Sequence, residues 1–113
     1  MDIPEKSVGN VGIILLSGRL DAYAANEVEQ KLNLLCAAAN ANVVVNLKSL
    51  DYISSSGLRV LLAALKKVRK QKGDIRLACL QTYVREVFDT AGFTQLFKLF
   101  DKEEDAIDSF KGA

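Results

Sequence analysis

Histidine is absent from this chain of 113 residues, tryptophan is missing, and only one proline is present. Histidine is the commonest general base and the commonest metal ligand, so its absence excludes Ser-His-Asp catalysis and removes most metal sites. The two cysteines, Cys36 and Cys79, are too few and too far apart for a zinc pattern. The sequence therefore predicts no metal and no cofactor. Both cysteines lie in apolar segments, where we expect buried core thiols.

Long apolar runs and an excess of one charge are also missing. Apolar runs such as Ile13-Ile14-Leu15-Leu16 are far too short to span a bilayer. Residues 1–5 lack the basic start and apolar stretch of a secretory signal. The formal net charge is +1, so no overall field attracts the chain to nucleic acid or to a membrane surface. We therefore expect a cytoplasmic protein with no membrane insertion and no nucleic-acid partner.

The lysine- and arginine-rich stretch 66–72 is the feature most similar to a nucleic-acid patch. It falls at the end of a predicted helix, where cations suit the helix dipole. No aromatic residues alternate with the basic ones, so stacking on bases has no support. A solvated helix face is the favoured interpretation. The chain also lacks the glycine-rich motifs that bind nucleotide phosphates.

Short apolar runs and apolar residues at helical spacing alternate along the chain. Its length fits one compact domain, which we expect to span 1–113. The expected strands are 3–8, 11–16, 42–47, 74–80 and 96–100, and the expected helices are 22–40, 58–72, 82–91 and 101–110. This order, β-β-α-β-α-β-α-β-α, predicts an α/β domain. Its sheet is mixed and mostly parallel, with an N-terminal antiparallel hairpin and helices packed against it.

Finer expectations depend on single residues. Ser17-Gly18 is expected to end the second strand, and 48–53 is expected to be a loop. Thr82 can cap the third helix, and Asp101 with Glu104 resembles a capping box at the start of the fourth.

Three serines and a glycine, Ser54-Ser55-Ser56-Gly57, lie where the third strand has ended and the second helix begins. In parallel α/β sheets, ligands and chemistry gather at this edge. Helix capping explains one serine, because serine oxygens satisfy the free N–H groups of a helix start. Phosphorylation is the alternative, since a helix N-terminus favours anions and the added charge would act on a protein docked over the turn.

Two charged residues each have two interpretations: Arg59, just after this serine turn (54–57), and Asp21. Arg59 opposes the helix dipole, and it either reaches solvent or pairs with an added phosphate. Asp21 follows the second strand, where it can cap the first helix or lie near the serine turn.

A catalytic serine finds little support. The first lysines of the same helix, Lys66 and Lys67, lie well along it from Ser56, and the serine run does not fit the glycine-serine-glycine nucleophile elbow. Together with the lack of histidine, this predicts that the chain is not an enzyme.

Five segments follow one another in an order that is typical of one family. They are 17–21 (SGRLD), 43–47 (VVVNL), 50–58 (LDYISSSGL), 72–73 (KG) and 84–92 (VREVFDTAG). The chain resembles the STAS domain over nearly its whole length, and within it the bacterial anti-sigma factor antagonists. The resemblance implies that an anti-sigma factor, itself a serine kinase, binds the unmodified chain and frees its target. Phosphorylation by that kinase ends the complex, and a PP2C-type phosphatase resets the switch.

By the same resemblance, the phosphorylated residue is Ser55, with Asp21 close to it. Many family members have aspartate where this chain has Ser54, so Ser54 is a competing phosphoacceptor. Ser56 is a further alternative. The expected partner-binding residues are Asp21, Ser54, Ser55, Ser56, Gly57, Leu58 and Arg59. The alternative function is a constitutive STAS scaffold, or a subunit of a signalling or lipid-transport complex, without a serine switch.

Overall fold

The computed structural model describes residues 1–111, which form one five-stranded sheet with four α-helices. The strands are β1 (Glu5–Val8), β2 (Val11–Leu20), β3 (Asn42–Ile53), β4 (Asp74–Ala78) and β5 (Leu99–Phe100), and they lie in that order across the sheet. The helices are α1 (Ala22–Leu35), α2 (Ser55–Lys70), α3 (Thr82–Thr90) and α4 (Glu103–Asp108). β1 and β2 are antiparallel and the later pairs are parallel, so the predicted fold class is confirmed.

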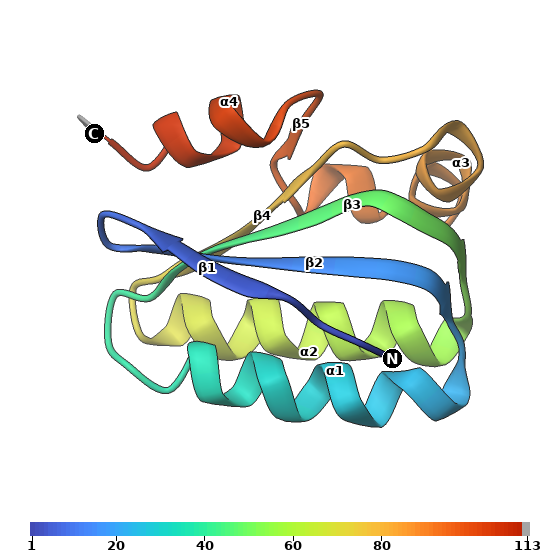
Figure 1. The fold of residues 1–113 in the computed structure, drawn as a ribbon, viewed down its shortest axis with the longest axis horizontal. Coiled ribbons are helices and arrows are strands. Elements are labelled where there is room, and N and C mark those ends of the chain that lie inside the picture. The colour runs from blue at the N-terminus through green and yellow to red at the C-terminus, as the bar shows by residue number, and fades with distance from the viewer. Residues whose placement is uncertain (112–113) are drawn as a thin grey trace.

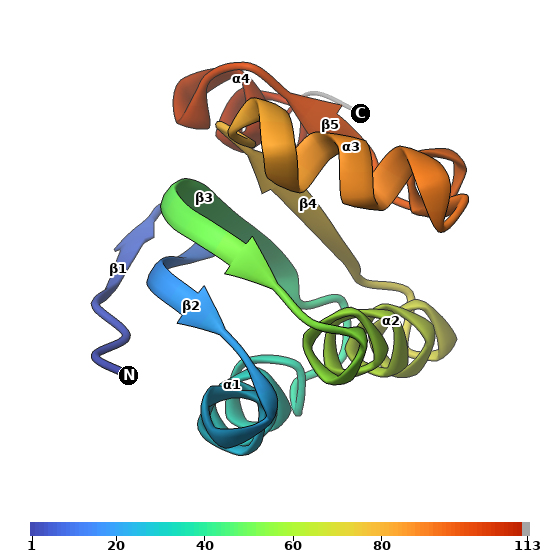
Figure 2. The same cartoon turned by 90° about the vertical axis from the view of Figure 1, so that its right-hand side faces the viewer.

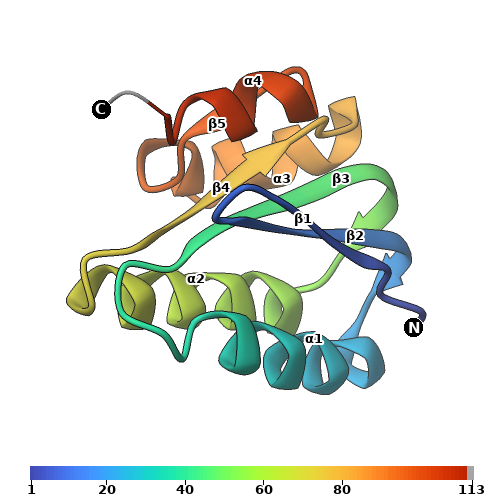
Figure 3. The same ribbon diagram turned by 60° about the vertical axis from the view of Figure 1, so that its left-hand side comes forward.

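Two apolar clusters pack on the two faces of the sheet. The larger cluster joins the strands to α1, α2 and α3, through side chains such as Val28, Leu65 and Phe88. The smaller cluster joins Ala106 and Ile107 of α4 to the opposite side of β2, β3 and β4. Figures 1 and 3 show α1 and α2 below the sheet and α4 above it. Within residues 1–111, no helix combines the length and the apolar character that a bilayer span needs.

β2 and β3 run further than the sequence predicts. The predicted loop at 48–53 is wrong, because β3 continues to Ile53, and Ser17-Gly18 does not end β2. The pairing of β2 with β3 survives through two register shifts, one on either side of Ser17-Gly18. Gly18 has a φ of +73°, which glycine adopts without the steric cost that a side chain brings and which is typical of a β-bulge. A residue pair that predicts a strand end therefore marks a bulge instead.

Helix boundaries also differ from the prediction. α1 ends at Leu35 rather than near residue 40, since the chain must turn back to enter β3 beside β2. Thr82 lies inside α3 and does not cap it. Lys102, not Asp101, occupies the N-cap position of α4 and makes no capping hydrogen bond, so the predicted capping box is wrong. The acidic first turn of α4 suits the positive end of the helix dipole without such a cap.

The last two strands are shorter than predicted. β4 ends before Cys79, whose φ of +63° departs from strand geometry. The strand expected at 96–100 is reduced to β5, because Phe93–Gln95 form a 3-10 turn and Phe97 is buried in the larger cluster. The ring of Phe97 packs edge-on against that of Phe88, at 6.0 Å between centroids.

A buried polar side chain links the sheet to α4. Asn46 of β3 is 5% exposed, and its amide donates a hydrogen bond to Oε1 of Glu103 at 3.0 Å. Lys6 of β1 pairs with Oε2 of the same carboxylate at 2.8 Å. Partial burial would raise the pKa of Glu103, but the hydrogen bonds from Asn46 and Lys6 and the charges of Lys6 and Lys48 outweigh it. The pKa of Glu103 therefore lies below its ordinary value.

We expect Glu103→Gln to lower the free energy of unfolding at neutral pH by less than about 1 kcal/mol, because Lys6 is largely exposed. A carboxylate whose pKa is lowered on folding stabilises the fold above its unfolded pKa, and this contribution is lost as the pH falls through the folded value. Urea denaturation should show a gap between the free energies of unfolding of the two proteins near pH 7, and this gap should narrow as the pH falls below about 4. A gap of the same size in acid would contradict this account.

Candidate functional site

The carboxyl ends of β2 and β3 lie side by side and place two helix starts together. Leu20, the last residue of β2, is the register partner of Ile53, the last residue of β3. The N–H of Ser54 then donates to the carbonyl of Leu20 at 2.9 Å. Figure 2 looks onto this edge and shows β2 running into α1 beside β3 running into α2. Asp21, directly after Leu20, therefore belongs to the loop that adjoins the serine turn.

Asp21 caps α1, as one of its two interpretations predicts. Its Oδ1 accepts hydrogen bonds from the N–H groups of Tyr23 and Ala24, each at 3.1 Å. A side-chain cap of this kind typically contributes about 1 kcal/mol to stability. The capping role and the place beside the serine turn are compatible, because the carboxylate stands at the same edge of the sheet.

The three serines of the turn have different surroundings. Ser54 is the N-cap of α2, and its Oγ accepts a hydrogen bond from the N–H of Gly57 at 3.1 Å. Ser55 is the first residue of the helix and is exposed. Ser56 is half-buried on the side that faces α1. Capping therefore explains Ser54 and leaves the most accessible hydroxyl to Ser55.

Gly57 is buried because α2 starts in close contact with the end of β2. A Cβ at this position would lie 2.7 Å from Cγ of Leu20 and 3.0 Å from the Leu20 carbonyl oxygen. It would also lie 3.0 Å from Cγ1 of Ile53. Only glycine lets the helix approach this closely, so Gly57 sets the position of the serine turn against the sheet.

Leu58 and Arg59 complete the first turn of α2 and lie in different environments. Leu58 is half-buried against the larger cluster, whereas Arg59 is exposed. Arg59 and Ser56 line a groove of about 390 Å³ between α1 and α2, whose other wall includes Ala25 and Glu29. The groove thus presents both signs of charge next to the serine turn.

Comparison with known proteins identifies the family. The STAS domain model matches residues 3–106 of this chain. This chain belongs to the STAS domain family. BtrV of Bordetella bronchiseptica, which carries the name of an anti-sigma factor antagonist, is 34% identical over 113 residues, covering 100% of this chain and 97% of BtrV. The anti-sigma-B factor antagonist of Bacillus subtilis is 30% identical over 92 residues, covering 81% of this chain and 84% of that protein. Within the STAS family, the chain groups with the anti-sigma factor antagonists.

Solved structures share the STAS fold. The anti-sigma factor antagonist SpoIIAA in its unphosphorylated form matches with a TM-score of 0.84 at 24% identity, over 99% of this chain and 98% of SpoIIAA. SpoIIAA in its phosphorylated form matches with a TM-score of 0.76 at 23% identity, over 97% of this chain and 100% of that one. At these identities, the likeness establishes the fold alone.

Two aromatic residues near the carboxyl edge of the sheet in this STAS domain were not predicted as site residues. Tyr23, in the first turn of α1, is 91% exposed. The guanidinium of Arg19 lies 4.1 Å from the ring centroid of Tyr52, which precedes the turn on β3. Exposed aromatic side chains are typical of protein contact surfaces. The sequence does carry a signal for Tyr23, because helical spacing places it outside the apolar stripe of α1.

The described part of the STAS domain offers no evident place for a metal. Within residues 1–111, no three cysteine, aspartate or glutamate side chains are grouped so that they could hold an ion. The chemistry available around the serine turn is that of hydroxyl, carboxylate and guanidinium groups.

Proposed function

We propose that this chain is an anti-sigma factor antagonist controlled by phosphorylation of Ser55. The unmodified chain binds an anti-sigma factor that is also a serine kinase, and the bound kinase releases its target. Phosphorylation of Ser55 abolishes the complex, and a PP2C-type phosphatase restores the unmodified chain. In this role the protein acts in the cytoplasm as a binding partner and not as an enzyme.

The observation that carries the choice of Ser55 is the difference between the three serines. A kinase must bring its active site to a free hydroxyl, and Ser55 is exposed at the start of α2. The hydroxyl of Ser54 is engaged by the N–H of Gly57, and Ser56 is half-buried beside α1. Accessibility therefore favours Ser55 over both alternatives.

The position of Ser55 also fits a switch that changes binding without unfolding the chain. A phosphate there would stand at the N-terminus of a 16-residue helix, where free N–H groups and the helix dipole favour negative charge. Its charge of roughly −1.5 to −2 would then act on whatever protein covers the turn. Asp21 lies in the adjoining loop, so the modified edge would carry two neighbouring anionic groups.

We assign the partner surface to the residues around this edge. Asp21 and Arg59 supply charge, and the exposed Tyr23 supplies a large amphipathic contact. Gly57 and Leu58 hold the turn in place rather than reach outward, since the first is buried and the second is half-buried. Ser54 caps the helix on which the surface is built.

The names of the relatives support the class of partner. BtrV and the Bacillus subtilis protein are both named as anti-sigma factor antagonists. SpoIIAA, which shares the fold, has structures in an unphosphorylated and a phosphorylated form.

Phosphorylation of purified variants tests the site. We expect incubation with the cognate anti-sigma factor kinase and ATP to add one phosphate to the parent chain and to Ser56→Ala, as measured by intact mass. Ser55→Ala should gain none. Ser54→Ala should still be modified, although loss of its cap lowers stability by about 1 kcal/mol, so its folding is checked by circular dichroism. Labelling of Ser55→Ala at the rate of the parent would assign the switch to another serine.

A further inference from the structure

The face of the sheet that carries α4 is only partly covered. α4 has six residues and packs over Val11, Ile13 and Val44, while Leu15 remains half-buried beyond its reach. Next to Leu15 lies a hollow of about 500 Å³, which we call the sheet pocket. Its lining includes Lys6, Ile13, Leu15, Asn46, Lys48 and Cys79. Small-molecule sites typically measure about 300–1,000 Å³, so the sheet pocket has the size of a ligand site.

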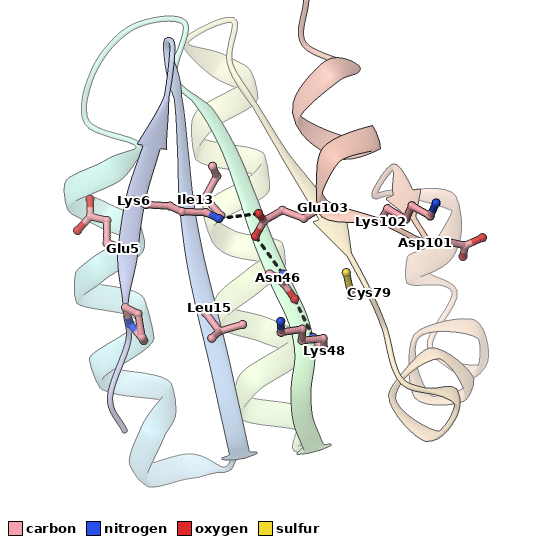
Figure 4. A pocket seen from close by; sticks show the side chains of 11 residues that line it. Glu5, Lys6, Ile13, Leu15, Asn46, Lys48, Cys79, Asp101, Lys102 and Glu103 are labelled. Carbon is pink, nitrogen blue, oxygen red and sulfur yellow. Dashed lines mark hydrogen bonds and ion pairs between the residues drawn. The ribbon is translucent and has the colours of Figure 1, made fainter.

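The sheet pocket has an apolar floor and a closed end. Leu15 of β2 forms the accessible part of the floor, with Pro4 on the β1 side, because Ile13 also lines the pocket but is only 2% exposed. Figure 4 shows the side chain of Lys6 extending past Ile13 to meet Glu103. This ion pair forms the wall of the pocket on the side of α4. Such a bounded hollow suits a short molecule better than a continuous peptide.

Among the charged side chains that line the sheet pocket, one cation has no anion to balance it. Glu5 points away from the hollow in Figure 4 and pairs with Lys31 of α1 at 2.9 Å. Asp101 and its neighbour Lys102 also point outward and offset each other. Lys6, Lys48 and Glu103 remain, which are two cations and one carboxylate.

Lys48 supplies that excess cation over the apolar floor. The carboxylate of Glu103 is already held by Lys6 and Asn46. Figure 4 shows the ammonium of Lys48 turned toward Leu15, next to the floor. A ligand that matches this site therefore combines a single negative charge with an apolar body.

We propose that the sheet pocket binds a small amphipathic monoanion, such as a medium-chain carboxylate, with its headgroup on Lys48 and its hydrocarbon on Leu15 and Pro4. This binding site is separate from the serine turn, and it does not depend on the switch proposed above. The charge-assisted pair with Lys48 fixes the headgroup, and burial of the ligand's hydrocarbon chain supplies the remaining affinity.

Cys79 provides a built-in reporter for occupancy. It lines the sheet pocket and is half-buried, whereas Cys36 is 1% exposed. Burial raises the pKa of the Cys36 thiol, although the charge of Lys67 opposes this, so Cys36 reacts slowly with thiol reagents. Modification of the folded chain by a reagent such as DTNB therefore reports on Cys79. A Cys79→Ser variant checks that the signal comes from this thiol.

We expect decanoate, kept below its micelle concentration, to slow the modification of Cys79 in a saturable way, and decanol to do so at least about tenfold less effectively. Lys48→Gln should raise the half-protecting decanoate concentration about tenfold. Lys98→Gln removes an exposed lysine from a different surface and should leave it unchanged. In an NMR titration with decanoate, the backbone amide signals of residues 13–15 and 46–48 should shift, and those of residues 54–57 should not.

Several results would overturn the proposal. Protection by decanol equal to that by decanoate, or protection unaffected by Lys48→Gln, would remove the anion preference. Absence of both protection and amide shifts would remove the site. If protection of Cys79 rose with the protein concentration and not with the decanoate concentration, a second copy of the chain would be covering this face.

Discussion

Phosphorylation of Ser55 is expected to weaken the complex with the cognate anti-sigma factor by at least about 100-fold. Ser55 stands exposed at the start of α2, beside the loop of Asp21, so a partner that covers this edge must bury its hydroxyl. Removing a phosphate from water without a matching cation, or beside a like charge, costs several kcal/mol, and about 2.7 kcal/mol corresponds to 100-fold in affinity. Isothermal titration calorimetry of the modified and unmodified chains measures the ratio.

A matched pair of variants separates the effect of charge at residue 55 from the effect of the same charge elsewhere on the protein. Ser55→Glu should reproduce part of the loss, because glutamate carries one charge and not the full phosphate. Ser7→Glu adds the same charge at an exposed serine of β1, whose register partner is Gly12 near the start of β2. Figure 1 shows this hairpin turn on the opposite side of the molecule from the start of α2. Ser7→Glu should bind like the parent. Equal losses in the two variants would contradict a local role for Ser55.

Gly57→Ala is expected to destabilise the fold by a net of about 1–2 kcal/mol and to weaken partner binding. Alanine gains about 1 kcal/mol of helix propensity over glycine, but overpacking costs about 1–3 kcal/mol, and a contact with backbone falls in the upper part of that range. The clash is of the costly kind, since one of the atoms within 3.0 Å is the backbone oxygen of Leu20. Relief requires α2 to move away from β2, which stretches the hydrogen bond between Ser54 and Leu20. Urea denaturation gives the stability.

Gly12→Ala is the control for this substitution. Gly12 lies in β2, and a Cβ there would meet its nearest neighbour, a side-chain atom of Leu35, at an ordinary 3.5 Å. We expect stability within about 0.5 kcal/mol of the parent, as for substitutions away from special features. If Gly57→Ala were as stable and bound as tightly as Gly12→Ala, the close approach of α2 to β2 would not matter for the site.

Several features of the site could be predicted from local sequence, because local chemistry produces them. An aspartate after a buried strand and a serine before an amphipathic helix both cap helices, and Asp21 and Ser54 do so here. Their proximity could not be established from sequence alone, because it depends on β2 and β3 staying paired through the two register shifts around Ser17-Gly18. The pattern instead predicted that both strands end early.

The sheet pocket depends on contacts between distant parts of the chain, so no local pattern indicates it. Glu103 meets Asn46 across 57 positions of sequence, and Lys6 approaches the same carboxylate from the opposite edge of the sheet. Helical spacing predicts that a helix follows residue 101, but it does not predict that this helix stops at six residues and leaves Leu15 uncovered. Tyr23 is different, since its place on the polar face of α1 follows from the sequence once that face is examined.

The most direct test of the account is the phosphorylation state of the protein in its own cells. Trypsin cleavage after Lys48 and Arg59 releases residues 49–59, a peptide that contains all three serines of the turn. Fragmentation of this peptide by mass spectrometry, on protein free in the lysate and on protein captured with the anti-sigma factor, assigns the phosphate to a residue. We predict phosphate on Ser55 in the free protein and none in the captured protein. Phosphate on Ser55 in both fractions, or on Ser54 or Ser56 alone, would contradict the central claim.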